Sequence, residues 1–162
     1  MQRRDQHRKR FETPGQARLL TFSTFHRLPY LEPVWARNLF VDHLALTRDR
    51  LGIQLYAWVV MPDHVHLLLL PDPTVADTSR ILSALKTRSS TKIAERLRKN
   101  DEPVVRIWQR GGGHDRNITT HRQFLESVDY IEDNPVRKGM VARREDYPWS
   151  SAGSSVIGRD RW

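Results

Sequence analysis

The stretch that decides the fold is Ala57-Trp58-Val59-Val60-Met61-Pro62-Asp63-His64-Val65-His66-Leu67-Leu68-Leu69-Leu70. Two apolar runs separated by a short segment with proline and aspartate predict two strands joined as a β-hairpin. Alternate side chains of a strand point to the same face of a sheet. His64 and His66 are therefore expected to lie together on one face, with Val65 on the other.

Two imidazoles held on one face suit a divalent metal ion, because neutral imidazole is the commonest metal ligand in proteins. The alternative is a polar interruption of a core strand, in which each histidine hydrogen-bonds to a neighbour. A pair of histidines in so apolar a segment favours a metal or catalytic site.

Outward from the hairpin, residues 17–25 predict a first strand, and residues 32–50 predict a helix that ends at Gly52. Residues 75–98 predict a long amphipathic helix, and residues 104–109 a fourth strand. A third helix is expected to start at Thr119 or Thr120, either of which suits the N-cap, and to run to about Asn134. Pro135 disfavours helix in the residue before it.

The order β-α-β-β-α-β predicts an α+β fold of the split βαβ type, ferredoxin- or RRM-like. Its antiparallel sheet carries helices on one face, has the hairpin strands in its middle, and is followed by a C-terminal helix. We expect residues 1–16 to form a basic flexible arm, residues 17–152 a single catalytic domain, and residues 153–162 a tail.

Charge indicates the class of partner. The 162 residues include 27 Lys and Arg against 19 Asp and Glu, a formal net charge of +8. This excess favours nucleic acid as the partner, with an anionic membrane surface as the second choice. The chain has no cysteine, which excludes disulfides and thiolate metal sites. No apolar run approaches the roughly 20 residues of a membrane span, so we expect a soluble, cytoplasmic protein.

The third predicted helix supplies two more candidates. Tyr130 and Asn134 are four residues apart and share a stripe distinct from the apolar one. Asn134 offers a carbonyl oxygen to a hard cation, and Tyr130 offers a phenolic nucleophile. The alternative is a half-buried tyrosine followed by an ordinary helix-end asparagine.

Four motifs together resemble the single-tyrosine HUH transposases, and most closely their REP-associated tyrosine transposase branch in bacteria. They are His64-Val65-His66, Trp108-Gln109-Arg110, Tyr130-Ile131-x-x-Asn134-Pro135-Val136-Arg137 and Trp149-Ser150-Ser151. The resemblance covers about residues 17–152. It implies that His64 and His66 hold Mg²⁺ or Mn²⁺, that Asn134 is the third ligand, and that Tyr130 is the nucleophile.

The resemblance also implies a reaction and a substrate. The enzyme would cleave and rejoin single-stranded DNA that contains a palindromic hairpin, through a 5′-phosphotyrosine and without a nucleotide cofactor. It would act as a monomer or a homodimer. Basic residues near the expected site are candidates for DNA contact: Lys86, Arg88, Arg110, Arg116 and Arg137. Two alternatives stay open, a non-cutting nucleic-acid-binding regulator on the same scaffold and a metal-dependent nuclease in which water attacks.

Overall fold

The computed structural model describes residues 13–111 and 113–161, so most of the predicted N-terminal arm lies outside the described residues. Four strands form a single antiparallel sheet in the order β2-β3-β1-β4: β1 (Ala17–Ser23), β2 (Gln54–Val60), β3 (His64–Leu70) and β4 (His114–Ile118). The helices are α1 (Val34–Leu51), α2 (Thr78–Lys99), α3 (His121–Glu132) and the single turn α4 (Asn134–Arg137). Two short 3₁₀ turns complete the fold, η1 (Phe25–Arg27) and η2 (Arg144–Asp146).

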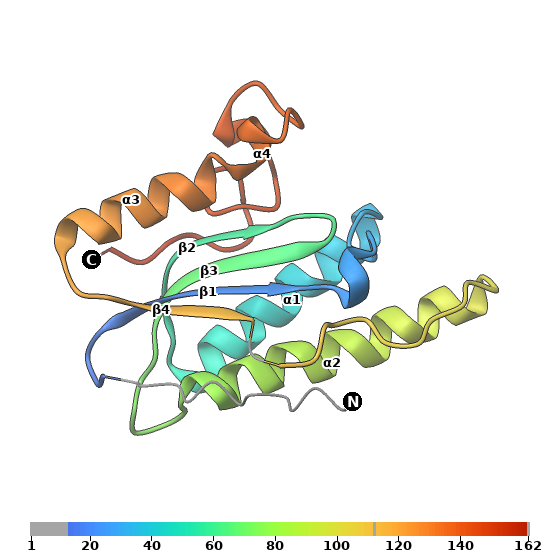
Figure 1. Ribbon diagram of the computed structural model, residues 1–162, viewed down its shortest axis with the longest axis horizontal. Helices are drawn as coiled ribbons and strands as arrows, with labels where there is room; N and C mark the ends of the chain where they lie inside the picture. The colour runs from blue at the N-terminus through green and yellow to red at the C-terminus, as the bar shows by residue number, and fades with distance from the viewer. Residues whose placement is uncertain (1–12, 112, 162) are drawn as a thin grey trace, which may run out of the picture.

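The helices lie on both sides of the sheet. α1 and α2 cover one face, and α3 crosses the other with α4 at its far end (Figure 1). The predicted α+β architecture, with two helices on one face and a later helix that carries Tyr130, is confirmed. No helix among the described residues is long and apolar enough to cross a membrane.

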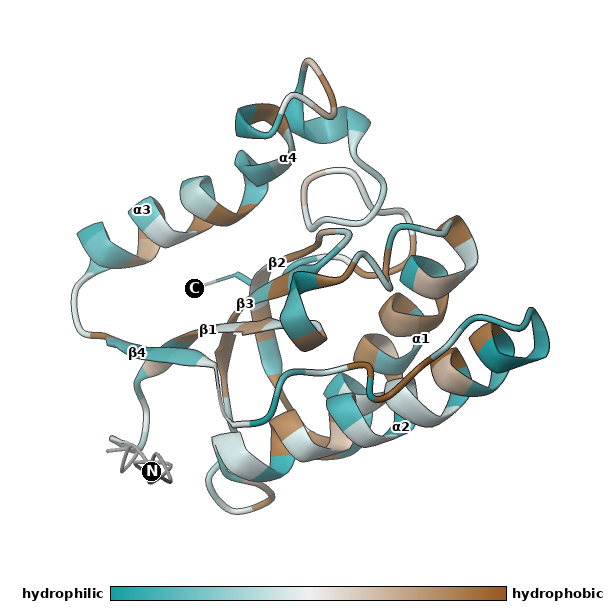
Figure 2. Cartoon of the chain, turned by 45° about the vertical axis from the view of Figure 1, so that its right-hand side comes forward, coloured by the Kyte–Doolittle hydropathy of each residue, from teal (hydrophilic) through white to brown (hydrophobic). Residues whose placement is uncertain are grey.

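Alternation along the strands divides the apolar side chains into two cores. Leu20 and Phe22 of β1 pack with α1 and α2, whereas Ala17 and Leu19 belong to the smaller core beneath α3. Hydropathy colouring shows apolar colour on β2 and β3, while β4 is mostly hydrophilic (Figure 2). The sheet therefore has an apolar centre and one polar edge strand.

The prediction of a fourth strand at residues 104–109 is wrong. Ile107 and Trp108 are buried there, but the segment makes only an isolated bridge, between Trp108 and Thr24. The real β4 begins at His114 and is polar because it is an edge strand, and its Asp115 is paired with Arg18 of β1 at 2.6 Å. The prediction based on apolar content therefore selected a loop that packs into the core. It missed the polar edge strand that completes the sheet.

A glycine permits this edge to form. Gly113 has φ +68°, and a Cβ at that position would lie 2.0 Å from the carbonyl oxygen of Thr21. Only a residue without a side chain lets the chain enter β4 so close to β1.

The placement of both hairpin strands in the middle of the sheet is also wrong. β3 is central, but β2 lies at the edge. The C-terminal segment covers that edge, because the Ser151 amide donates to the Trp58 carbonyl and the Asp160 amide donates to the Leu55 carbonyl, both at 2.8 Å. Ile157 of the predicted tail is buried in the larger core. β2 resembles a central strand in sequence because its edge is not exposed.

The third helix follows its prediction closely. Its N-cap is Thr120, whose side chain accepts a hydrogen bond from the Gln123 amide. The helix ends at Glu132, and the chain turns at Asp133 into α4 with Pro135 in its first turn. Asn134 consequently lies at the start of a new helical turn rather than at the end of α3.

Candidate active site

The histidine pair lies at the start of β3. His66 is opposite Thr21 and His64 opposite Ser23 of β1. The two imidazoles are 5% and 4% exposed, and their ring centroids are 4.8 Å apart. Because Leu68, two residues further on, packs in the core beneath α3, the pair is on the α3 face of the sheet. The expected common face is therefore observed.

Each ring is oriented by a hydrogen bond at Nδ1. His64 Nδ1 is 2.6 Å from Asp63 Oδ1, and His66 Nδ1 is 2.7 Å from Thr21 Oγ1. An imidazole that donates from Nδ1 to a carboxylate or hydroxyl keeps a lone pair on Nε2. This is the arrangement that second-shell partners impose on metal-ligating histidines.

Burial keeps both imidazoles uncharged. It lowers the pKa of His64, although the hydrogen bond and charge of Asp63 act in the opposite direction. Burial, with smaller contributions from His64, Arg137 and Arg27, lowers the pKa of His66 to about 3. Both shifts favour the neutral ring, which is the state required for metal binding.

α3 brings the tyrosine to the histidines. Its buried side carries Phe124 and Ile131, while Tyr130 is 45% exposed beside the sheet. The Tyr130 ring meets the His66 ring edge to face, with centroids 5.2 Å apart. On the other side, the Arg137 guanidinium lies 4.7 Å from the tyrosine ring centroid and donates to the Tyr130 carbonyl at 2.6 Å. The phenol is thus held between α4 and the histidine pair.

Asn134 is a candidate donor for a metal ion. Nowhere in the described part of the chain do three His, Asp or Glu side chains gather to hold an ion by themselves, so a metal here needs a further ligand. The Asn134 side chain is buried, and its Oδ1 has no hydrogen-bond partner among residues 13–111 and 113–161. A buried amide oxygen without a partner is costly unless something binds it. Two neutral imidazoles and one amide oxygen form a mixed nitrogen and oxygen donor set that could ligate a divalent cation.

Residues 20–134 match the family described as "Transposase IS200 like". The chain belongs to this transposase family. A REP-associated tyrosine transposase of Escherichia coli (strain K12) is 30% identical over 109 residues, which are 67% of this chain and 59% of the relative. A Haemophilus influenzae (strain ATCC 51907 / DSM 11121 / KW20 / Rd) protein assigned the same name is 32% identical over 119 residues, 70% of this chain and 67% of the relative. The resemblance to this family is therefore confirmed.

Solved structures agree on the fold of the transposase. A REP-associated tyrosine transposase bound to a REP hairpin matches with a TM-score of 0.70 at 23% identity, over 88% of this chain and 80% of that chain. A protein of Deinococcus radiodurans R1, assigned as a transposase, matches with a TM-score of 0.52 at 24% identity, over 78% and 96% of the two chains.

The five basic residues predicted to contact DNA are spread over both sides of the transposase. Arg137 touches Tyr130, and Arg116 of β4 is on the α3 face, with its guanidinium 3.5 Å from Ser127 Oγ of α3.

Lys86 and Arg88 belong to α2, on the opposite face, where Lys86 donates to the Gly111 carbonyl at 2.8 Å. Arg110 is exposed in the loop before β4. The structure therefore brings only Arg137 to the histidine pair and its tyrosine.

Two other cations near the histidines were missed in the sequence. The charges of Arg27 and Lys138 contribute to the lowered pKa of His64. Arg27 lies just after β1, and in an antiparallel β1–β3 pair the end of β1 lies beside the start of β3. The pairing of β1 with β3 could therefore have indicated from the sequence that Arg27 lies near His64.

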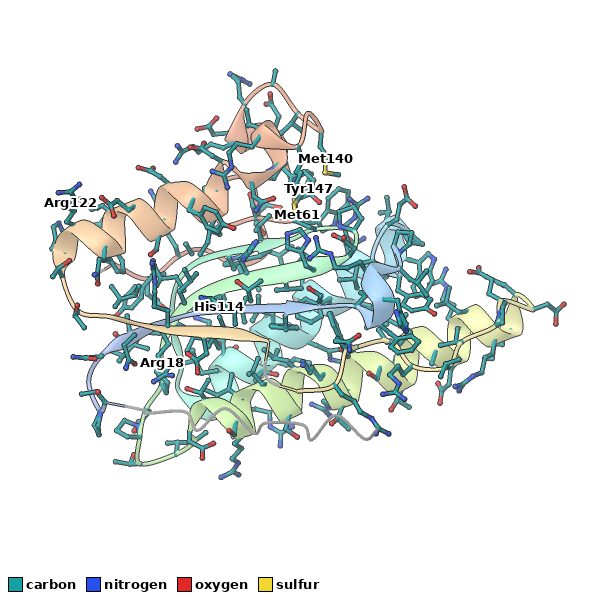
Figure 3. All side chains as sticks on the ribbon, viewed as in Figure 1. Arg18, Met61, His114, Arg122, Met140 and Tyr147 are labelled. Carbon is teal, nitrogen blue, oxygen red and sulfur yellow. The ribbon has the colours of Figure 1, made fainter. Side chains whose placement is uncertain are left out.

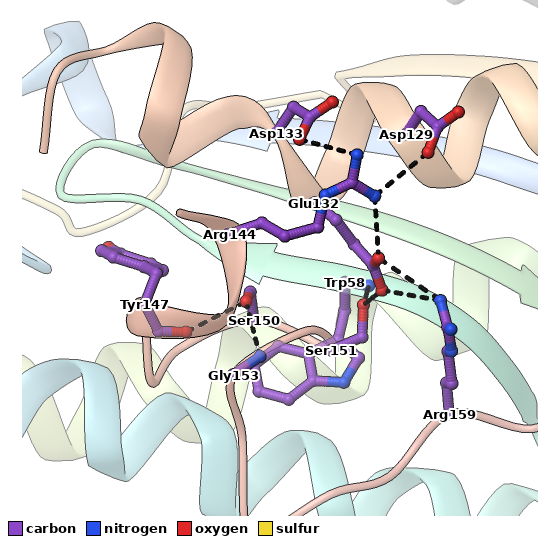
Figure 4. A network of polar contacts seen from close by, with 10 residues as sticks. All are labelled: Trp58, Asp129, Glu132, Asp133, Arg144, Tyr147, Ser150, Ser151, Gly153 and Arg159. Carbon is purple, nitrogen blue, oxygen red and sulfur yellow. Dashed lines mark hydrogen bonds and ion pairs between the residues drawn. The ribbon is translucent and has the colours of Figure 1, made fainter. Parts of the chain in front are cut away.

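The end of α3 is anchored by a polar group that we call the Glu132 cluster: Asp129, Glu132, Asp133, Arg144, Ser151 and Arg159 (Figure 4). The Arg144 guanidinium is paired with Asp133 at 2.8 Å, Asp129 at 3.0 Å and Glu132 at 3.4 Å. The buried Glu132 carboxylate also accepts from Ser151 Oγ at 2.7 Å and from Arg159 at 3.2 Å.

The cluster connects α3 to the segment that covers β2, because Ser151 also bonds the Trp58 backbone. Its members flank Tyr130 and Asn134 in the chain, so the cluster fixes the turn on which both are carried. Three carboxylates at a helix C-terminus oppose the helix dipole and require cations nearby, which was the signal in the sequence.

A second anchor lies beside the hairpin turn. The buried Tyr147 hydroxyl donates to the Val60 carbonyl at 2.8 Å and accepts from Arg37. Tyr147 and Met61 lie near each other between α4 and the sheet, whereas Arg122, at the start of α3, points away from the sheet (Figure 3). The N-terminal end of α3, which carries Arg122, is therefore solvated, whereas the C-terminal end, which carries Tyr130, is anchored.

Proposed function

We propose that this transposase cleaves and rejoins single-stranded DNA, with Tyr130 as the nucleophile. The observation that carries the proposal is the position of the Tyr130 ring against His66, one of two buried, neutral and oriented imidazoles. A half-exposed phenol beside a potential metal site combines a nucleophile with a means of stabilising charge on phosphate.

In the proposed reaction the Tyr130 oxygen attacks the phosphorus of a phosphodiester. A bond forms between that oxygen and phosphorus, the bond to the 3′-oxygen breaks, and a 5′-phosphotyrosine and a free 3′-hydroxyl result. The ester retains the energy of the broken bond, so a 3′-hydroxyl of a second strand can reverse the step without a nucleotide cofactor. Arg137 holds the tyrosine in place through its ring and its carbonyl.

His64, His66 and Asn134 are the residues that would hold Mg²⁺ or Mn²⁺. When bound, such an ion would supply Lewis-acid stabilisation at a non-bridging phosphate oxygen. Asp63 and Thr21 keep the two imidazoles in the required orientation. The unpartnered Asn134 oxygen and the two neutral rings support this assignment.

The substrate we propose is DNA with a palindromic hairpin. The solved relative with the same fold is bound to a REP hairpin, and the curated relatives are named for REP elements. The formal net charge of +8 agrees with a polyanionic partner.

The test is capture of the covalent intermediate. Wild-type protein and Tyr130→Phe are incubated with 5′- or 3′-labelled single-stranded hairpin DNA and Mn²⁺, then separated on a denaturing gel. We expect a shifted protein–DNA band for the wild type with the 3′-label only, because a 5′-phosphotyrosine keeps the DNA on the 3′ side of the break attached to the protein. No shifted band is expected for Tyr130→Phe. Cleavage retained by Tyr130→Phe would indicate attack by water, and binding without any cleavage would indicate a regulator.

A further inference from the structure

The turn that follows β1 contains two successive residues in the left-handed region. His26 has φ +51° and Arg27 has φ +58°. This conformation is unfavourable for residues with a side chain and is adopted most readily by glycine. Backbone held in this way often occurs at functional sites.

The turn is tied directly to the residue that precedes the histidine pair. The Thr24 amide donates to the Asp63 carbonyl at 2.9 Å, and Thr24 Oγ1 lies 2.6 Å from the Leu28 carbonyl and 3.0 Å from that of Asp63. On its other side, the Phe25 amide donates to the Ile107 carbonyl at 2.8 Å. The turn therefore has a defined position relative to His64.

The Arg27 side chain continues this connection. Its Nε lies 2.9 Å from Asp63 Oδ2, while Asp63 Oδ1 holds His64 Nδ1. Its Nη1 donates to Ser23 Oγ at 3.0 Å. The Arg27 side chain is 53% exposed, so these bonds occupy part of the guanidinium and leave the remaining N–H groups at the surface beside the histidines.

A purely structural role explains this residue poorly. Glycine would adopt the turn at lower cost, and an ion pair exposed to this extent contributes little to stability. A guanidinium held in this way, with N–H groups that have no partner among residues 13–111 and 113–161, is instead well suited to bind a phosphate, because its fork geometry matches phosphate oxygens.

We propose that Arg27 binds a phosphate of the DNA strand at the reaction centre and stabilises the charge that develops there during cleavage. The inference rests on the proposed function. Arg27 approaches from the β1 side, whereas Tyr130 approaches from α3 and Arg137 from α4. The two sides together enclose the position of a phosphate bound at the histidine pair.

The test replaces Arg27 with glycine, which suits the left-handed backbone while removing the guanidinium. For Arg27→Gly we expect an unchanged or higher Tm, a single-turnover cleavage rate lowered about 100-fold or more, and hairpin affinity lowered less than about tenfold. Arg27→Lys should restore part of the rate, because it keeps the charge without the fork. The matched control is Arg106→Gln, since Arg106 packs over Phe25 of the same turn, 4.9 Å from the ring centroid, and should leave the rate within about threefold of wild type.

A folded Arg27→Gly protein that cleaves within threefold of the wild-type rate would overturn the inference. Arg27→Asn, which also tolerates the left-handed region, repeats the measurement if the glycine variant does not fold. Unfolding of both variants would likewise overturn it, because Arg27 would then be a folding residue. Failure of the wild type itself to form the covalent band would refute the proposed function instead, so the two failures are distinguishable.

Discussion

The two faces of the sheet are built from the same strands but serve different purposes. On β3, the residues Val65, Leu67 and Leu69 face α1 and α2 and join the larger core, while His64, His66 and Leu68 face α3. Trp108, Phe22 and Phe40 close the first face with ring contacts at centroid distances of 5.1 to 6.1 Å. The second face has fewer apolar contacts and is held in place by polar anchors.

This difference separates stability from chemistry within one sheet. Burial of apolar surface is the main stabilising contribution, and most of it is on the α1–α2 face. The α3 face can consequently carry polar side chains whose hydrogen-bonding capacity is not fully used, such as Asn134. Substitutions on the two faces should therefore have different consequences for folding and for activity.

The largest expected effect is on activity alone. Tyr130→Phe should lower DNA cleavage by at least about 10⁴-fold, because it deletes the proposed nucleophile. The free energy of unfolding should change by less than about 0.5 kcal/mol, since the side chain is half-exposed. Chemical denaturation and hairpin binding measured on the same preparation check this separation. A variant that loses stability as well as activity would contradict it.

Leu67 and Leu68 are adjacent, fully buried, and on opposite faces, so they form a matched pair. Each change to alanine should lower the free energy of unfolding by about 2–5 kcal/mol. Only Leu68→Ala should also slow cleavage by the folded protein, because its cavity lies beneath the helix that carries Tyr130. Equal cleavage rates for the two variants, measured well below their Tm, would show that the faces are not functionally distinct.

Asn134→Ala tests the third metal ligand. We expect Mn²⁺ affinity, measured by calorimetry, to fall at least about tenfold. Stability without metal should not fall, since the substitution removes a buried oxygen that lacks a partner. Asn134→Asp, which retains an oxygen donor, should preserve binding. Unchanged Mn²⁺ affinity in the alanine variant would exclude Asn134 as a ligand.

Arg144 and Arg143 provide a further comparison within the α3 side. Arg144→Gln should lower kcat about tenfold with little change in KM, because Arg144 holds the end of α3 that carries Tyr130. Arg143 is paired with Asp146 in an exposed i,i+3 pair, so Arg143→Gln should have almost no effect. Equal effects of the two variants, or a change confined to KM, would mean that net charge rather than positioning is responsible.

The smallest effect is expected on the α1–α2 face and depends on pH. Burial and the charges of Arg88 and Lys92 lower the pKa of His43, and Asp42 acts in the opposite direction. The unfolded chain takes up this proton near pH 6.5 and the folded chain resists it, so stability falls as the pH decreases below that value. Between pH 7.5 and 5.5, wild type should therefore lose more stability than His43→Leu in urea denaturation. Parallel pH profiles would refute this.

Local spacing was sufficient for several elements. The hairpin and the common face of His64 and His66 follow from the period of two residues in a strand. The start of α3 at Thr119 or Thr120 follows from the preference for threonine at the N-cap. The family resemblance also rests on short motifs that are continuous in the chain. These features require no knowledge of which distant segments meet.

Long-range packing explains the errors. Ile107 and Trp108 are apolar because they close the core, not because they form a strand, and β2 is apolar because a C-terminal segment covers its edge. Neither fact is expressed in the local pattern. The carboxylates at the end of α3 indicate that cations lie nearby, but the local pattern does not name those cations, since Glu132 and Arg159 are 27 positions apart.

The sequence by itself determined the secondary structure around the hairpin, the pairing of the two imidazoles and the family, because each depends on neighbouring residues. Only the tertiary structure decided that Tyr130 meets His66, that the buried Asn134 oxygen has no partner among the described residues, and that the Arg27 guanidinium reaches Asp63. Those arrangements depend on how α3 and the β1 turn pack on the sheet. That packing is a balance of many distant contacts, and spacing along the chain does not record it.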